Sequence, residues 1–320
     1  ATIDAWVARG ARLGRGDADA VLASEVPALD DPDLVLQTAP YAPVGHPDDD
    51  YRCYVLARGI DAVLTAVELA PEDASVVHHA NLSAVTPWDG GAALLALDDA
   101  DPGAGFDCNE GKGAGALQGD ERKLLGWGPG RGPTLLPAGT GLPLGADDWL
   151  LMTVHYNVTG GVAGPAPIRV ALRTAEAVDQ PLARLKLMDP AWKDGAFEVL
   201  PGEVAVHTYE VPVRDAILDG LDPTGGLWVH SASLHMHLRG VTASASLRRA
   251  GGGEVRLLDI PRWDFDQQLD YLFREPVLAG PDDTLVVSCT QENVDGTEAV
   301  TWGPDTSNEM CGAPLFVSAP

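Results

Sequence analysis

The sequence predicts an all-β protein made of two tandem antiparallel β-sandwich, jelly-roll-like domains with a short N-terminal helix. Short runs rich in Val, Leu and Thr recur along the chain, and Gly and Pro lie between them as turn residues. This pattern is typical of sandwiches and jelly rolls. The length of 320 residues suits two domains. The runs expected to form strands are Tyr51–Leu56, Ala62–Leu69, Leu150–Val158, Ile168–Thr174, Val204–Val211, Leu227–Leu238 and Thr284–Thr290.

The chain is expected to begin with a helix and to divide once. Ile3, Trp6 and Val7 share one face at helical spacing, which predicts a helix over Thr2–Leu13. A change from one set of strands to the next indicates a boundary near Ala175–Leu185. We therefore expect a leader helix and extended lead-in over 1–45, a first sandwich over 46–178 and a second over 179–320.

The strong negative charge limits the classes of partner. The chain carries 47 acidic and 21 basic residues, a formal net charge of −26, and a field of this sign repels phosphate backbones. No apolar run reaches the roughly 18 residues that a membrane-spanning helix needs. We therefore expect no nucleic-acid partner and no membrane span, with any export signal lying outside this sequence.

Four cysteines suit two disulfides. They are Cys53, Cys108, Cys289 and Cys311. Three connectivities are open, of which sequential pairing is the simplest, with one bridge in each half. Disulfides indicate an oxidising compartment, so we expect a periplasmic or extracellular protein. Free buried thiols are the alternative.

Two histidines in the expected strand Leu227–Leu238 are spaced to bind one metal ion. Residues alternate between the two faces of a strand. The even-numbered residues here are apolar and are expected to face the core, whereas His235 and His237 share the polar face. Two imidazoles at this spacing can chelate a metal ion. The alternative is a pair of solvated surface histidines.

A methionine near the end of the chain could complete that site. Met310 lies in a polar turn next to Cys311, and a disulfide at this cysteine would fix the methionine in place. A thioether with two imidazoles is a soft ligand set, which favours copper, especially Cu(I), over zinc or magnesium. The alternative is an ordinary exposed methionine.

The other histidines carry weaker signals. His155 points away from the apolar face of its expected strand, and alone it fits a hydrogen-bonded histidine as well as a ligand. His78 and His79 are adjacent, so a regular strand would point them to opposite faces, one to the core and one to the surface. Both reach one metal ion only if the strand is irregular there. We interpret the remaining three as structural or exposed: His46, His207 and His230.

A series of short motifs runs through residues 45–312. They are Tyr51-Arg-Cys-Tyr54, Val77-His-His79, Gly139-Thr-Gly-Leu-Pro143, Val154-His-Tyr156, Leu234-His-Met-His-Leu238, Val287-Ser-Cys-Thr290 and Asn308-Glu-Met-Cys311. In this order they resemble the motifs of the copper type II, ascorbate-dependent monooxygenases. The resemblance implies two β-sandwich domains, each with one copper site, and hence two copper ions per chain.

The resemblance also implies a role for each site. One copper would relay electrons, and its implied ligands are His78, His79 and His155. The other would bind O₂ and abstract a substrate hydrogen, and its implied ligands are the catalytic residues His235, His237 and Met310. The two sites would face each other across an open, solvated cleft. The implied disulfides are Cys53–Cys108 and Cys289–Cys311.

The implied reaction is hydroxylation of an activated C–H bond of a small organic substrate with O₂. An external one-electron reductant is required, either ascorbate or a cytochrome-type donor. Residues Ala1–Arg12 resemble the last helix of a small c-type cytochrome domain, although an ordinary leader helix is the alternative.

Departures from the family pattern bear on the substrate. Ser233 stands where the peptide-hydroxylating branch has an arginine, and Gly312 and Pro314 stand where that branch has an asparagine and a tyrosine. We therefore expect no peptidylglycine substrate, and a cationic substrate is conceivable for so acidic a chain. A non-catalytic copper-binding or copper-storage protein is the main alternative, and a structural or adhesive β-sandwich is a weaker one.

Overall fold

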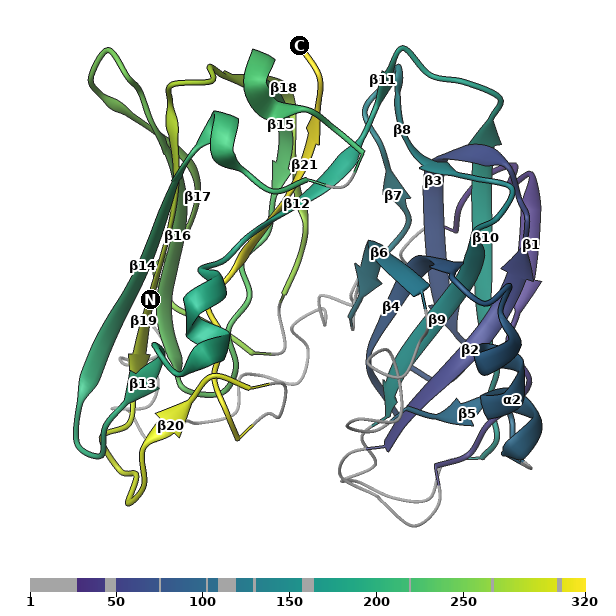
Figure 1. The fold of residues 1–320 in the computed structure, drawn as a ribbon. Helices are drawn as coiled ribbons and strands as arrows, with labels where there is room; N and C mark the ends of the chain where they lie inside the picture. The colour runs from purple at the N-terminus through teal and green to yellow at the C-terminus, as the bar shows by residue number, and fades with distance from the viewer. Residues whose placement is uncertain are drawn as a thin grey trace, which may run out of the picture.

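The structure, a computed structural model, describes residues 28–43, 50–74, 76–101, 103–108, 119–128, 131–156, 164–218, 220–265, 268–303 and 307–320. Within these ranges the chain is mostly β, with several antiparallel sheets and one α-helix, α2 (Ala92–Ala100). The predicted all-β class is confirmed. The expected helix over Thr2–Leu13 and His46 lie outside the described residues. Figure 1 shows the N-terminal half, purple to teal, beside the C-terminal half, green to yellow.

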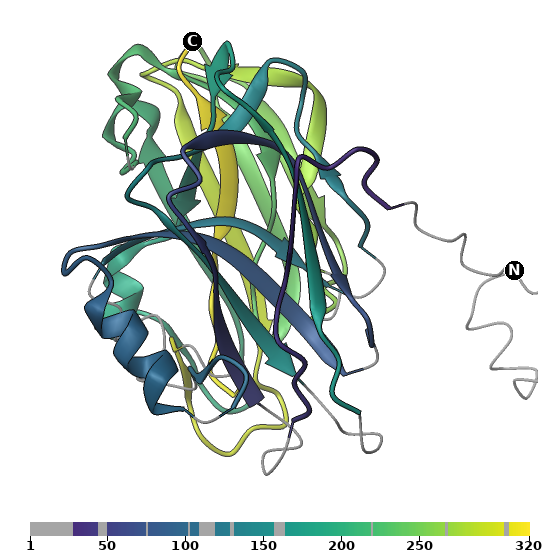
Figure 2. The same ribbon diagram turned by 90° about the vertical axis from the view of Figure 1, so that its right-hand side faces the viewer.

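The N-terminal half contains two sheets that enclose one apolar core. The first sheet holds, in spatial order, β1 (Leu34–Gln37), β10 (Ile168–Ala175), β3 (Ala62–Pro71), β8 (Thr140–Leu144) and β11 (Gln180–Pro181), with β7 (Thr134–Leu135) also paired to β3. The second holds β5 (Phe106–Asp107), β2 (Asp50–Arg58), β9 (Trp149–Tyr156), β4 (Val77–Pro87) and β6 (Gly119–Trp127). Leu64 of β3 and Leu82 of β4 meet in the core between them. Figure 2 turns this half toward the viewer, with α2 beside its strands.

The C-terminal half repeats the plan with two four-stranded sheets. One holds β12 (Ala183–Leu187), β21 (Ala313–Ser318), β15 (Leu227–Ala232) and β18 (Tyr271–Ala279). The other holds β14 (Val204–Pro212), β19 (Thr284–Glu292), β16 (Gly240–Arg248) and β17 (Glu254–Ile260). Val229 of β15 and Val287 of β19 share the core. The remaining elements are the strand pair β13 (Glu198–Val199) and β20 (Val300–Thr301), and the 3-10 helices η2 (Pro190–Asp194), η3 (Val213–Asp215) and η4 (Pro223–Gly225).

The predicted strands are found, with one shortened. The stretch Leu227–Leu238 is strand only as far as Ala232, so the prediction for its second part is wrong. Leu238 was expected in the core but is 61% exposed. The carboxylate of Glu309 accepts the backbone N–H groups of His237 and Arg239, so these groups do not bond to a neighbouring strand. The ordinary alternation of faces therefore ends before Leu238.

The chain passes from one set of sheets to the other at Leu182. Strand β11 before it pairs with β8, whereas β12 after it pairs with β21. The two halves also meet through polar contacts, because Arg184 of β12 donates to the carbonyl of Leu124 in β6 at 3.1 Å. Among the described residues, no helix is long and apolar enough to cross a membrane.

Candidate metal centres

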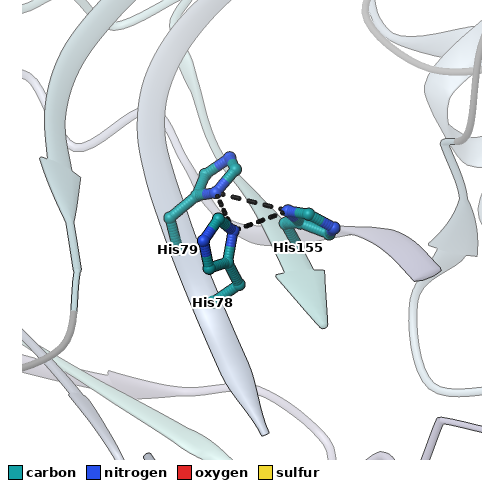
Figure 3. Close-up of side chains that lie close together, drawn as sticks. All are labelled: His78, His79 and His155. Atoms are coloured by element: carbon teal, nitrogen blue, oxygen red, sulfur yellow. Dashed lines mark hydrogen bonds between the residues drawn. The ribbon is translucent and has the colours of Figure 1, made fainter. Parts of the chain in front are cut away.

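Three histidines of the N-terminal half converge on one point. The Nδ1 atom of His78 lies 3.1 Å from that of His155 and 3.2 Å from that of His79, and the third Nδ1 pair is 3.4 Å apart. Figure 3 shows two of the rings leaving one strand and the third reaching them from its neighbour. Three nitrogens bound tetrahedrally to one metal ion at about 2.0 Å would lie about 3.3 Å apart. This cluster can therefore hold a metal ion through its Nδ1 atoms.

A β-bulge brings the two adjacent histidines together. Strands β4 and β9 are paired through Val77 with Tyr156 and then through His79 with His155, so the register shifts at His78. The extra residue breaks the alternation of faces, as bulges do next to functional sites. A site that includes both His78 and His79 requires an irregular strand, and this bulge is that irregularity.

Neighbouring residues partly bury the first cluster and pack against its rings. His155 is 1% exposed, and the ring of its cross-strand partner Tyr51 stacks on it at 4.2 Å between centroids. Burial, followed by the nearby His155 and His78, holds the pKa of His79 well below its usual value. His79 is therefore neutral near pH 7, which is the form that binds a metal ion.

The second pair of histidines lies beyond the end of β15. The rings of His235 and His237 are 5.1 Å apart between centroids. Nδ1 of His235 lies 2.6 Å from the side-chain oxygen of Gln268, and Nδ1 of His237 lies 3.2 Å from the backbone oxygen of Asn308. Because each Nδ1 is directed at a protein oxygen, Nε2 is the nitrogen that would bind a metal ion. Burial lowers the pKa of His235 to about 3, so this ring too is neutral.

Glu309 ties the methionine to this pair. Its carboxylate is fully buried and accepts the backbone N–H groups of His237, Arg239 and Met310. The backbone of His235 also pairs with that of Gly312, two residues after Met310. One buried side chain thus fixes the segment that carries His237 against the segment that carries Met310.

Two further contacts hold the methionine segment in place. The disulfide Cys289–Cys311, with a Cα–Cα distance of 5.8 Å, fixes the residue after Met310 to β19. Gln291 of the same strand donates to the backbone oxygen of Met310 at 3.3 Å and is itself held by His207 at 2.9 Å. His207 is therefore structural, as expected. His230, bonded to Ser318 at 2.9 Å and buried, is structural too.

The second disulfide lies in the N-terminal half. Cys53 of β2 is joined to Cys108, again with a Cα–Cα distance of 5.8 Å. Both bridges therefore follow the sequential pairing, and each connects parts of one half only.

One cavity connects the two groups of candidate ligands. It has a volume of about 1280 Å³ and is lined by residues of both halves, including His78, His79, His235, His237 and Met310. Phe265 lies between the groups, with its ring centroid 5.2 Å from that of His78 and 6.3 Å from that of His237. The two groups therefore face a shared space and are separated in part by a single aromatic ring.

Several residues of this site gave no signal in the sequence. Gln268 and Phe265 lie in a loop without regular spacing, and only the fold brings them to the histidines. Glu309 precedes Met310 within a motif, but nothing in the motif indicates that its carboxylate would bind the His237 segment. The one sequence signal that could have pointed to Glu309 is its position directly before the candidate ligand Met310.

The comparisons with known proteins point to the same family as the sequence motifs. Residues 199–316 match the family model described as copper type II ascorbate-dependent monooxygenase, C-terminal domain. Tyramine beta-hydroxylase of Caenorhabditis briggsae is 23% identical over 296 residues, which cover 84% of this chain and 45% of that protein. The chain therefore spans less than half the length of this relative.

Among solved structures the likeness is weak. The major capsid protein P2 of Bacteriophage PM2 is 10% identical with a TM-score of 0.31, covering 89% of this chain and 97% of that chain. The VP2 subviral particle of infectious bursal disease virus is 9% identical with a TM-score of 0.23, covering 89% and 72%. At these scores the likeness supports no inference.

Proposed function

We propose that this chain, a member of the copper type II ascorbate-dependent monooxygenase family, hydroxylates an activated C–H bond with O₂ at two separate mononuclear copper sites. The observation that carries the proposal is the convergence of three Nδ1 atoms within 3.4 Å of one another, beside a cavity that the second ligand group also lines. The ligands of the two ions are, respectively, His78, His79 and His155, and His235, His237 and Met310.

The donor atoms support copper at both sites. At the first site, three imidazole nitrogens suit a borderline metal such as copper. At the second site, two imidazoles and a thioether are softer, and they favour Cu(I) over zinc. The thioether belongs to Met310, whose backbone is held by Glu309 and by the disulfide at the next residue.

The proposed reaction balances with two electrons from an external reductant. Substrate R–H, O₂, two electrons and two protons give R–OH and H₂O. Copper, when bound, supplies the one-electron chemistry and the activation of O₂. The protein keeps His79 and His235 neutral by burial. It also directs Nδ1 of His235 and His237 to protein oxygens and separates the two groups with Phe265.

We propose the same partners and organisation as the sequence suggested. The two disulfides favour a periplasmic or extracellular protein. Ascorbate or a cytochrome-type protein would deliver electrons, one at a time. We propose a division into a lead-in over 1–45, a first domain over 46–178 and a second over 179–320. The catalytic residues would all lie in the second domain.

The substrate is a small organic molecule with an activated C–H bond. The relative from Caenorhabditis briggsae is, by its name, a tyramine hydroxylase, which makes an aryl-substituted carbon a reasonable target. Ser233, with no arginine at its position, argues against a peptide carboxylate held in the manner of the peptide-hydroxylating branch.

Oxygen consumption tests this proposal. The protein is reconstituted with copper, reduced with ascorbate and supplied with candidate substrates, while O₂ uptake and hydroxylated product are measured. The expected result is uptake coupled to product in a ratio of one to one. Copper-loaded, reduced protein that consumes no O₂ with any substrate would instead support the storage function.

A further inference from the structure

The charge of the cavity is opposite to that of the whole chain. Five of the chain's 21 Lys and Arg residues line this cavity, but only three of its 47 Asp and Glu residues do so. In a chain of net charge −26, an even distribution of charge would give a strongly acidic wall. The basic side chains in the wall therefore need a specific explanation.

Three of the five cations have acidic partners. Arg122 pairs with Asp148. Arg131 and Arg184 both pair with Asp270, at 3.2 and 3.5 Å. Burial acts to raise the pKa of Asp270, but the two guanidinium groups outweigh it and the net shift is downward. These three cations are accounted for by contacts within the protein.

Lys123 and Lys186 are different. Among the described residues, neither makes an ion pair within 4.0 Å, although both line the cavity. Lys123 belongs to β6 and Lys186 to β12, the edge strands that the two halves turn toward each other. An edge lysine commonly points to bulk water and prevents strand pairing, but these two point into the space that the metal ligands share.

Lys123 lines the same cavity as residues of both ligand groups. Its charge acts to lower the pKa of both His79 and His235, one from each group, and Lys186 acts on His235. Lys123 remains accessible to solvent in the cavity, yet the surrounding protein removes part of its hydration and lowers its pKa to about 8. An anion bound there would restore interactions that the lysine has lost.

We propose that the cavity binds a small organic acid as substrate, with the carboxylate held by Lys123 and Lys186 and the remainder of the molecule lying between the two ligand groups. The proposal rests on the monooxygenase function but concerns the class of substrate. It replaces the expectation of a cationic substrate, because the charge of the site is opposite to that of the chain. Like charge in the wall disfavours an ammonium group.

The test uses two probes that differ in charge. Phenylacetate and phenethylamine both carry a benzylic C–H bond, but one is an anion and the other a cation at neutral pH. Their binding is measured by calorimetry on the copper-loaded and the metal-free protein, and their hydroxylation is measured separately. The variants are Lys123→Met and Lys186→Met. Arg256→Met is the control, because it also removes one positive charge, but Arg256 lies on β17 in a surface ion pair with Asp259 and not in the cavity wall.

We expect phenylacetate to bind and phenethylamine to bind at least about tenfold more weakly. Lys123→Met and Lys186→Met should each weaken phenylacetate binding by roughly tenfold, with and without copper, and Arg256→Met should not. Lysine-dependent binding of phenylacetate would support the anion site. If the copper-loaded, reduced protein then consumed no O₂ with phenylacetate or any other candidate substrate, the monooxygenase function would be contradicted while the anion site stood.

Three outcomes would overturn the anion site alone. The first is hydroxylation of phenethylamine that is insensitive to both lysine variants, which would leave the monooxygenase standing. The second is a lysine effect confined to reduction by ascorbate, which would assign the lysines to the reductant and not to the substrate. The third is phenylacetate affinity that is unchanged in both variants, which would mean that the lysines serve only to protect the strand edges.

Discussion

The three histidines of the N-terminal half lie on two neighbouring strands of one sheet, whereas the ligands proposed in the C-terminal half lie beyond the ends of their strands. In the first group, a single bulge in β4 sets the geometry, and Nδ1 is the converging atom. In the second group, a buried carboxylate and a disulfide join two irregular segments, and Nε2 is the nitrogen proposed as ligand.

The difference shows two ways of placing candidate metal ligands on the same kind of scaffold. The first group is held by the backbone hydrogen bonds of a sheet, so its position should tolerate changes elsewhere. The second depends on a few side chains, above all Glu309, so it should be sensitive to single substitutions. The second site, proposed to bind O₂ and substrate, lies on segments outside the sheets, where binding residues are commonly found.

Removing one ligand from each group should separate them most strongly. His79→Ala and His235→Ala should each reduce the copper content from two ions per chain to one. Loss of a residue that only hydrogen-bonds to a metal ligand weakens metal binding by about 10- to 100-fold, so loss of a ligand itself should weaken it by at least about 100-fold. Copper content by elemental analysis checks this. Loss of both ions from either variant would mean that the two sites do not form independently.

The disulfides offer the next test. Replacing Cys289 and Cys311 by serine should lower the free energy of unfolding by about 3 kcal/mol and weaken copper binding at the second site only. The matched control replaces Cys53 and Cys108, which are 55 positions apart instead of 22. It should cost about 4 kcal/mol yet leave both copper ions bound. Equal copper loss in the two variants would contradict the special role of the bridge next to Met310.

Glu309 should matter to one site alone. Glu309→Ala leaves three backbone N–H groups without their acceptor, so copper affinity at the second site should fall by about 10- to 100-fold. The first site should be unchanged. Glu309→Gln keeps one acceptor oxygen, so its copper affinity at the second site should lie between the affinities of Glu309→Ala and the unchanged protein. Copper titration of all three proteins measures this, and an unchanged second site in Glu309→Ala would remove Glu309 from the account.

The fold was predictable because its signals are local. Runs of Val, Leu and Thr between turn residues became β2, β3, β9, β10, β14 and β19 with bounds close to those expected. The stretch Leu227–Leu238 failed because Glu309, 72 positions beyond His237, takes backbone donors that a neighbouring strand would otherwise have bound. A contact so distant in sequence leaves no mark on local alternation.

The candidate sites were predictable only in part. The spacing of His235 and His237 indicated a shared site without knowledge of the fold. The convergence of His78 and His79 could not be derived in this way, because it depends on the register of β4 against β9. Lys123 was also hidden, since a lysine on an edge strand looks the same in sequence whether it faces water or a cavity.

The smallest expected effect is the dependence of phenylacetate affinity on pH. Lys123 has a pKa of about 8, so it carries its charge below that pH and loses it as the pH rises further. Phenylacetate affinity should therefore be full below pH 8 and decline above it, by up to about tenfold. Lys186 and Arg184 oppose the charge of Lys123, and Asp270 and Glu121 favour it. In Lys123→Met the decline near pH 8 should disappear; a decline that persists would assign it to another group.

Anomalous diffraction at the copper edge, from crystals of the copper-loaded protein, tests the central claim most directly. We predict two peaks per chain. One should lie among the Nδ1 atoms of His78, His79 and His155, and the other beside Nε2 of His235 and His237 and the sulfur of Met310. A single peak, or two peaks at the zinc edge with none at the copper edge after reconstitution, would contradict the assignment of two copper sites.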